Sequence, residues 1–303
     1  MSEAVAGGTD PGPLRRRIVG ALIYPALLGL AYGLFHALGS QGVPGGAAAY
    51  LSVAAAIAGL VLYEQLQPAR PDWRPDRTEL ANDLLFLLLV QILLPFGLTL
   101  LVLEALVLLA DRWEVAQAGL WPHHAAPWAQ AGLMLILAEF PRYWLHRLSH
   151  HWAPLWRFHA VHHAPPRLYA LNVGRFHPVD KSLQFLADGL PFLLLGVSAE
   201  VLHFYFVFYA VTGFVQHSSG QILLGPLNWI IAGPELHRWH HSADPREGRC
   251  NFGNKLIVWD LLFGTRFLPA GRQVGRLGIE DRHFPTDFLG QMAAPLRRGE
   301  EKS

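Results

Sequence analysis

The sequence contains a single cysteine, Cys250, among 303 residues. Because a disulfide needs two thiols, the chain forms no intrachain disulfide, and it has no CxxC motif that could bind a metal. Charged residues are scarce, at 16% against roughly 25% in ordinary soluble domains. With 52% hydrophobic residues, this composition indicates a membrane protein. A formal net charge of +1 does not favour a nucleic-acid partner.

Two sequence motifs of hydrolytic sites are also missing. No histidine pair reads HExxH, so the general base of a zinc metalloprotease is absent. The chain has no GxSxG motif, and its one cysteine lies in no distinctive context, so nucleophilic catalysis has no support.

Long apolar stretches dominate what is present. A hydrocarbon core of about 30 Å needs about 20 apolar residues in a helix, and five stretches have suitable composition: 18–38, 47–66, 80–110, 128–145 and 183–215. The third is longer than one span needs and contains Pro95, so it forms either one kinked helix or a hairpin. The fifth is interrupted by glycine and proline and predicts a helical hairpin. We therefore expect an all-α, multi-pass integral membrane helix bundle with a helical cap.

Arginines in the short loops predict the orientation. Arginines at 15–17 precede the first stretch, which is too long for a cleaved signal peptide, and three more lie at 67–78, whereas 39–46 carries no charge. The N-terminus and the 67–78 loop are therefore expected in the cytoplasm, and the histidine-rich segments would meet on that face. The predicted organisation is a disordered tail at 1–14, transmembrane helices at 15–79, a catalytic membrane domain at 80–269 and a C-terminal tail at 270–303.

Histidines in repeated spacings point to a metal site. Residues at i, i+3 and i+4 share one face of a helix, so HxxxH and HxxHH each direct imidazoles toward one point. Nine ring nitrogens exceed the four ligands of a tetrahedral zinc site and are enough for two metals with open positions. The nine candidate ligands are His146, His150, His159, His162, His163, His217, His237, His240 and His241.

Nitrogen ligands alone do not distinguish iron from zinc. A histidine-rich metal transporter or metal-binding protein is the alternative function, although a transporter should place its ligands near the middle of the membrane. A b-type haem protein would leave seven of the nine histidines unexplained.

The three clusters resemble those of the fatty acid hydroxylase superfamily, which includes sterol desaturases and alkylglycerol monooxygenases. The matching motifs are HRLSH at 146–150, HAVHH at 159–163 and HRWHH at 237–241, together with RFHPVD at 175–180. The stretches 225–242 and 251–265 are similar to bacterial members of the sterol desaturase family. The resemblance covers roughly residues 80–267.

This resemblance implies a di-iron, O2-dependent oxidoreductase that hydroxylates or desaturates a lipid C–H bond. By motif match it makes the eight clustered histidines ligands, and His217 matches an additional ligand position. It also implies a lipid substrate and, for a bacterial member, the inner membrane. Nothing here resembles a fused cytochrome b5 domain, so electrons would come from a separate protein or reductant. The role of His151, which extends the first cluster, stays open.

Three further residues are candidates for supporting the site, or for binding the metals directly. Glu139 lies seven residues before His146 on the same helix face and could bond a ligand imidazole. His203 lies inside an apolar stretch, where ionisable groups tend to be functional. His177 could be a ligand, a hydrogen-bond donor or a helix cap, and Asp180 and Asp244 are further candidates for bonding a ligand.

Overall fold

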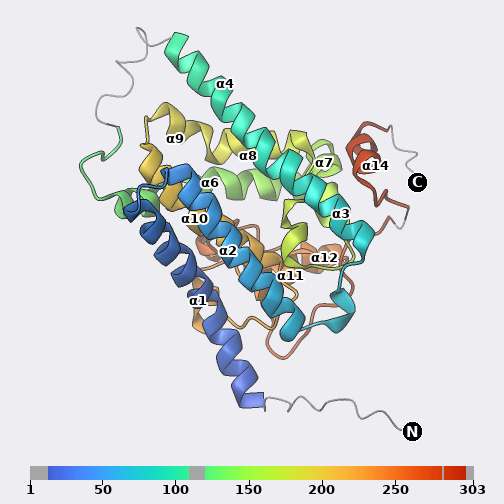
Figure 1. Cartoon of the computed structure of the whole chain (residues 1–303). Helices are drawn as coiled ribbons and strands as arrows, with labels where there is room; N and C mark the ends of the chain where they lie inside the picture. The colour runs from blue at the N-terminus through green and yellow to red at the C-terminus, as the bar shows by residue number, and fades with distance from the viewer. Residues whose placement is uncertain (1–12, 109–119, 282, 298–303) are drawn as a thin grey trace.

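The computed structural model describes residues 13–108, 120–281 and 283–297, which form helices and contain no β-strand (Figure 1). This confirms the predicted all-α fold. Isolated antiparallel bridges join loops at three places, among them Pro68 with Gly220 and Ile231 with Leu256. The tail predicted at 1–14 lies outside the described residues up to residue 12, and helix α1 begins at Pro13.

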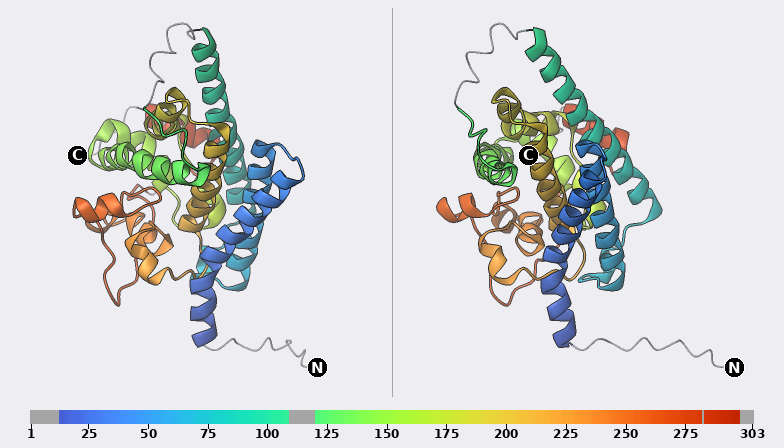
Figure 2. Two further views of the ribbon diagram at one scale, coloured as in Figure 1. Left: turned by 90° about the vertical axis from the view of Figure 1, so that its left-hand side faces the viewer. Right: turned by 60° about the vertical axis from the view of Figure 1, so that its left-hand side comes forward.

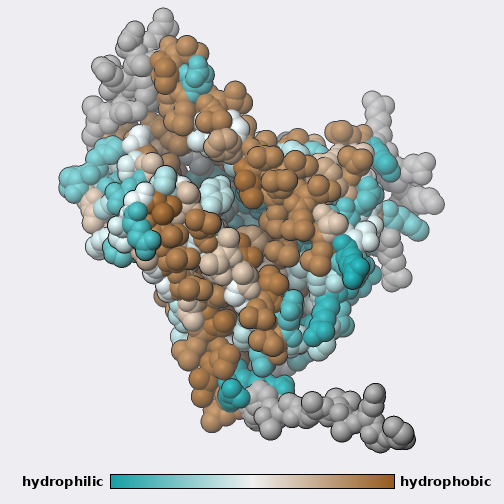
Figure 3. Space-filling model, viewed as in Figure 1, coloured by the Kyte–Doolittle hydropathy of each residue, from teal (hydrophilic) through white to brown (hydrophobic). Residues whose placement is uncertain are grey.

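Three helical stretches of the described chain are long and apolar enough to cross a membrane. They are α1 (Pro13–Ser40), α2 (Gly45–Leu66) and the continuous stretch Arg77–Leu108. Only 11% of the most apolar window in the third stretch is buried in the protein. Apolar side chains cover the face that α1, α2 and α4 present in Figure 3. Because exposed leucine and valine side chains are favourable in hydrocarbon and unfavourable in water, these helices fit a bilayer.

The third stretch is one helix through Leu108, with no hairpin turn. It consists of α3 (Arg77–Leu85), the π-helical segment η2 (Phe86–Leu93) and α4 (Leu94–Leu108). Asp76 and Glu79 form a capping box at its start. The Leu94 N–H donates to the Leu89 carbonyl, five residues back, immediately before Pro95. The wider turn removes the need for an i−4 bond where proline interrupts the ladder, so the helix continues.

The other two predicted spans are also helical, but they are not among the three membrane-length apolar helices. Residues 128–145 lie in α6 (Pro127–His151), which crosses the direction of α4 at a wide angle (Figure 2). Polar Gln130, Glu139 and Arg142 interrupt its apolar sequence and are buried against the protein. Residues 183–215 are broken after α8 (Pro178–Asp188) by the short α9 (Leu190–Leu194), and α10 (Ala199–His217) follows.

The N-terminal helices share one core with the later part of the chain. Helix α10 packs against both α1 and α2, and the Tyr24 hydroxyl lies 2.9 Å from the Thr212 hydroxyl. The segment from residue 270, which was expected to be a C-terminal tail, also packs against the helices that precede it. Its helix α14 (Phe288–Ala293) places the Phe288 ring 4.8 Å from the Phe86 ring.

Short helices make up the rest of the described helical structure. They are η1 (Pro71–Trp73), α7 (Ala153–His163), η3 (Ala170–Gly174), η4 (Gly225–Trp229), α11 (Pro234–His240), α12 (Pro245–Gly248), α13 (Val258–Leu262) and η5 (Ala294–Leu296).

Candidate metal centre

Four helices converge so that all nine predicted histidines meet in one place. The last turns of α6 carry two, α7 carries three in its second half, α10 ends on one, and α11 carries two with a third directly after it. Eight of the nine side chains are buried, and His146 is partly buried. Because buried polar groups normally have a hydrogen-bond or metal partner, their convergence marks a candidate functional centre.

The nine histidines form two groups. In each group, one ring nitrogen per residue lies within 4.8 Å of those of the others, a spacing that could hold a metal ion. The rings of His163 and His241 stack across the boundary with centroids 4.2 Å apart, so the groups are neighbours. We call His146, His150, His159, His163 and His240 group A, and His162, His217, His237 and His241 group B.

Group A contains nitrogen atoms that no protein atom satisfies. The Nε2 atom of every member is buried and has no hydrogen-bond partner among the described residues. An unpaired polar atom in a protein interior costs about 1–3 kcal/mol. Five such atoms that lie close together could form the donor set for a cation, so the residues present fit a metal.

In group B, Nε2 atoms of neighbouring histidines face one another instead of lying without a partner. The Nε2 atom of His237 lies 3.0 Å from Nε2 of His217 and 3.1 Å from Nε2 of His241. A neutral imidazole carries one N–H, so the His237 nitrogen could donate to only one of these neighbours. A metal ion would satisfy all three lone pairs at once.

Hydrogen bonds to Nδ1 orient five of the rings. The Nδ1 atoms of His159 and His217 lie 2.8 Å from the side chains of Asp180 and Asn172. Three other Nδ1 atoms contact backbone carbonyls, which are His146 with Phe252 at 2.8 Å, His162 with Arg175 at 3.2 Å and His240 with Cys250 at 2.7 Å. Because Nδ1 donates its hydrogen to these acceptors, Nε2 keeps a free lone pair for a metal.

Burial keeps these imidazoles neutral. It is the largest cause that lowers the pKa of His162, His163, His237 and His241 well below 6.5, and repulsion from neighbouring histidines lowers it further. Burial likewise lowers the pKa of His240 to about 3. Metals bind the neutral ring, so these histidines are in the form that metal binding requires.

Glu139 supports the site from a different position than predicted. Its carboxylate accepts from the backbone N–H groups of Asn254 and Lys255, at 3.0 and 2.7 Å, and no contact with a histidine is seen in the described structure. Asp260 holds the same loop, because its carboxylate accepts from the N–H groups of Phe252 and Gly253 at 2.8 and 2.6 Å. The two acids therefore fix the loop whose Phe252 carbonyl contacts His146.

The other predicted histidines lie outside both groups. The His177 Nδ1 atom accepts from the Val179 N–H at 3.1 Å, as a helix cap, and its Nε2 lies 3.2 Å from the Met292 carbonyl. His203 lies against Gly45, where α2 begins. His151 is exposed and contacts the Arg147 carbonyl.

Of the two aspartates predicted as supports, Asp180 contacts His159. Asp244 instead pairs with Arg246 at 3.0 Å.

Sequence reasoning missed several supporting residues. Asn172 lies in unremarkable sequence, and Asp260 lies in the stretch 251–265, for which the resemblance assigned no role to a carboxylate. Asp83 pairs with Arg175 at 2.6 Å, and both side chains are buried; the carbonyl of Arg175 then accepts from His162. The sequence does indicate Asp83, because an acidic residue inside an apolar, membrane-length stretch is energetically unfavourable unless it has a structural or functional role.

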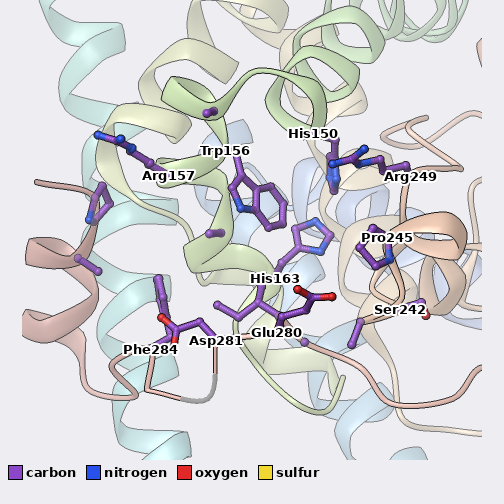
Figure 4. Close-up of a pocket in the computed structure, with 18 of the residues that line it drawn as sticks. His150, Trp156, Arg157, His163, Ser242, Pro245, Arg249, Glu280, Asp281 and Phe284 are labelled. Carbon is purple, nitrogen blue, oxygen red and sulfur yellow. The ribbon is translucent and has the colours of Figure 1, made fainter. Parts of the chain in front are cut away.

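A cavity of about 930 Å³ opens beside group A (Figure 4). His150, His163 and His240 form part of its wall, together with Trp156 of α7. Substrates or small molecules can therefore approach group A from this side.

Comparisons with known proteins agree with this site. The fatty acid hydroxylase family model matches residues 131–265, which include all nine histidines. The ornithine lipid hydroxylase OlsE of Rhizobium tropici is 35% identical over 286 residues, which cover 92% of this chain and 85% of that protein. Alkylglycerol monooxygenase of Xenopus tropicalis is 29% identical over 149 residues, covering 49% of this chain and 32% of its own length.

The fatty acid hydroxylase vlmA of Lecanicillium sp is 34% identical over 150 residues, covering 43% of this chain and 40% of its own length. No solved structure gives a significant match. The match to OlsE extends over most of both proteins, and the family model falls on the helices that carry the histidines. The chain therefore belongs to the fatty acid hydroxylase family.

Proposed function

We propose that this chain is a membrane-bound, di-iron, O2-dependent oxidoreductase that hydroxylates a lipid C–H bond. The unpartnered Nε2 atoms of group A carry this proposal, because they form a ready donor set with no other explanation. Group A would hold one iron and group B the other. When bound, the two irons would supply the activation of O2 that an unreactive C–H bond requires.

The residues around the histidines prepare the site for such chemistry. The ring centroids of Phe252 and Trp156 lie 5.4 and 5.3 Å, respectively, from the ring centroid of His150. Phe176 stacks on His162 at 4.0 Å. These aromatic side chains cover part of the imidazole surface and limit the access of water there, and the hydrogen bonds at Nδ1 fix the orientation of five of the rings.

A lipid substrate follows from the relatives, whose printed names are ornithine lipid hydroxylase, alkylglycerol monooxygenase and fatty acid hydroxylase. None of the three is named as a metal transporter, so the alternative function gains no support. Desaturation would use the same ligands and is distinguished by its product. Electrons would come from a separate donor protein or reductant.

We propose that both histidine groups face the cytoplasm, in a bacterial inner membrane. The contacts at the end of α2 support this orientation. Glu64 accepts from the Ser219 N–H at 2.7 Å, and the Arg238 guanidinium lies 5.7 Å from the Trp73 ring centre. The arginine-bearing loop 67–78 therefore lies beside the residues that follow His217. We retain residues 80–269 as the proposed catalytic region.

Metal analysis and lipid profiling together test the proposed function. Protein from iron-replete cells should contain about two iron ions per chain, and the cells should accumulate a lipid with one added oxygen atom. His163→Ala should abolish the product, whereas His123→Ala, in an exposed loop before α6, should not. A product that lacks two hydrogens would indicate desaturation. Equal products from the two variants would contradict the proposal.

A further inference from the structure

Charges of both signs surround the cavity beside group A. Arg157, Arg249, Glu280 and Asp281 line it (Figure 4), and Arg297 is a further lining residue. Its volume of about 930 Å³ is in the range of sites that bind small molecules. A hydrocarbon chain would gain nothing from these groups, so the cavity suits a polar ligand.

The most informative of these charges are unpaired. Arg157, Arg249 and Glu280 are exposed and form no hydrogen bond or ion pair with any residue that the structure describes. Nearby charges outside the cavity are paired instead, Arg246 with Asp244 and Arg272 with Glu247. The wall of the cavity therefore carries free cations and a free carboxylate together with His150 and His163.

We propose that this cavity binds the headgroup of the lipid substrate, and that this headgroup carries both an anionic and a cationic group. Arg249, which lies beside His150, binds the anionic group, and Glu280 binds the cation, an amine. This inference rests on the proposed lipid hydroxylation. It adds that the C–H bond presented to group A lies in the headgroup or next to it, because the headgroup and the imidazoles share one cavity.

The apolar part of the same lipid has its own contacts. Trp152, Trp156 and Phe284 line the cavity, and the Trp152 side chain is 52% exposed. A chain attached to the headgroup can leave past these rings toward the bilayer, where aromatic side chains are favourable at the interface. A docking surface for an electron-donor protein would instead be expected to carry mostly one sign of charge.

Lipid retention tests the proposal without relying on turnover. The purified full chain in detergent is offered an equimolar mixture of four lipids and analysed by native mass spectrometry. The lipids are an N-acyl amino-acid lipid with free carboxylate and amine, its methyl ester, its N-acetylated form and a diacylglycerol. The unmodified lipid should be retained most. Arg249→Gln should reduce its preference over the ester about fivefold, and Glu280→Gln its preference over the acetylated form similarly.

Arg246→Gln is the matched control, since Arg246 lies three residues from Arg249 and outside the cavity lining. It should leave retention unchanged. Equal retention of all four lipids, or equal effects of the two arginine variants, would overturn the headgroup site. The headgroup site would also be overturned if the Arg249→Gln variant kept the lipid preference and only showed slower reduction of its bound metal by a donor protein. Because binding is measured directly, an inactive but lipid-selective protein would refute the proposed reaction while supporting this site.

Discussion

The Nδ1 atom of His159 lies 2.8 Å from Oδ2 of Asp180, and both side chains are buried. Gln184 donates to the other carboxylate oxygen at 3.1 Å. Burial alone would raise the pKa of Asp180, but the interactions with His159 lower it below its ordinary value. Asp180 is therefore an anion behind one imidazole of group A, where it increases the basicity of Nε2.

Asp180→Asn should weaken metal binding about 10- to 100-fold while leaving the helices intact. The amide keeps the shape of the carboxylate but removes the charge that stabilises a metal-bound imidazole. Competition with a chelator measures the affinity, and circular dichroism checks the fold. Asp244→Asn, at an exposed ion pair, is the control. An unchanged affinity in Asp180→Asn would show that this contact is only structural.

The two histidine groups should lose metal separately. His150→Ala removes a candidate ligand of group A, and His237→Ala removes a candidate ligand of group B. Each variant should retain about one ion per chain if each group binds one ion. Metal analysis of the purified proteins, with His123→Ala as the control, measures this. Loss of both ions in either variant would mean that the groups bind metal only as a unit.

Acid should destabilise the metal-free protein from about pH 6.5 downward. The folded pKa values of His162, His163, His237 and His241 lie well below 6.5, so the unfolded chain binds more protons than the folded chain in this range. Stability then falls with falling pH by about 1.4 kcal/mol per pH unit for each such histidine. Thermal unfolding between pH 7.5 and 5 should show the loss, with a smaller slope in His162→Gln. Equal slopes would be inconsistent with this origin.

Gly253→Ala should disturb the loop that orients His146. A Cβ at this position would collide with the Leu256 carbonyl and lie 2.9 Å from Oδ2 of Asp260. We expect a loss of about 1–3 kcal/mol of stability and a lower metal content. Gly132→Ala, in α6 with no atom within 4 Å of the new Cβ, should be neutral or stabilising by about 0.5–1 kcal/mol. Thermal unfolding and metal analysis compare the two.

Cysteine labelling can test the proposed orientation directly, because the only native cysteine, Cys250, is buried. Ser40→Cys places a thiol between α1 and α2, and Arg246→Cys places one near the histidines. An impermeant maleimide should label the first in intact cells and the second only after permeabilisation. Labelling of both from the same side would refute the topology.

Local patterns predicted three of the long apolar helices and named the candidate ligands. Three predicted apolar stretches are membrane-length helices, because a run of about 20 residues rich in leucine, alanine and valine is favourable in hydrocarbon. His146 and His150 lie near each other on α6 because four residues are close to one helical turn. The stretch 128–145 was harder to interpret, because its polar side chains face buried protein contacts that composition does not reveal.

The division of the histidines needed the fold. His162 and His163 are adjacent but belong to different groups, as do His240 and His241, because consecutive residues of a helix point about 100° apart. The other histidines of each group are determined by how α6, α7, α10 and α11 pack against one another.

The sequence by itself therefore determined the residue types, their helical spacing and the apolar lengths of the membrane helices, all of which are local. Only the tertiary structure decided the two groups, the partners Asn172, Asp180 and Phe252 at their Nδ1 atoms, and the charged cavity beside group A. These depend on contacts between residues far apart in the chain, which no local pattern encodes.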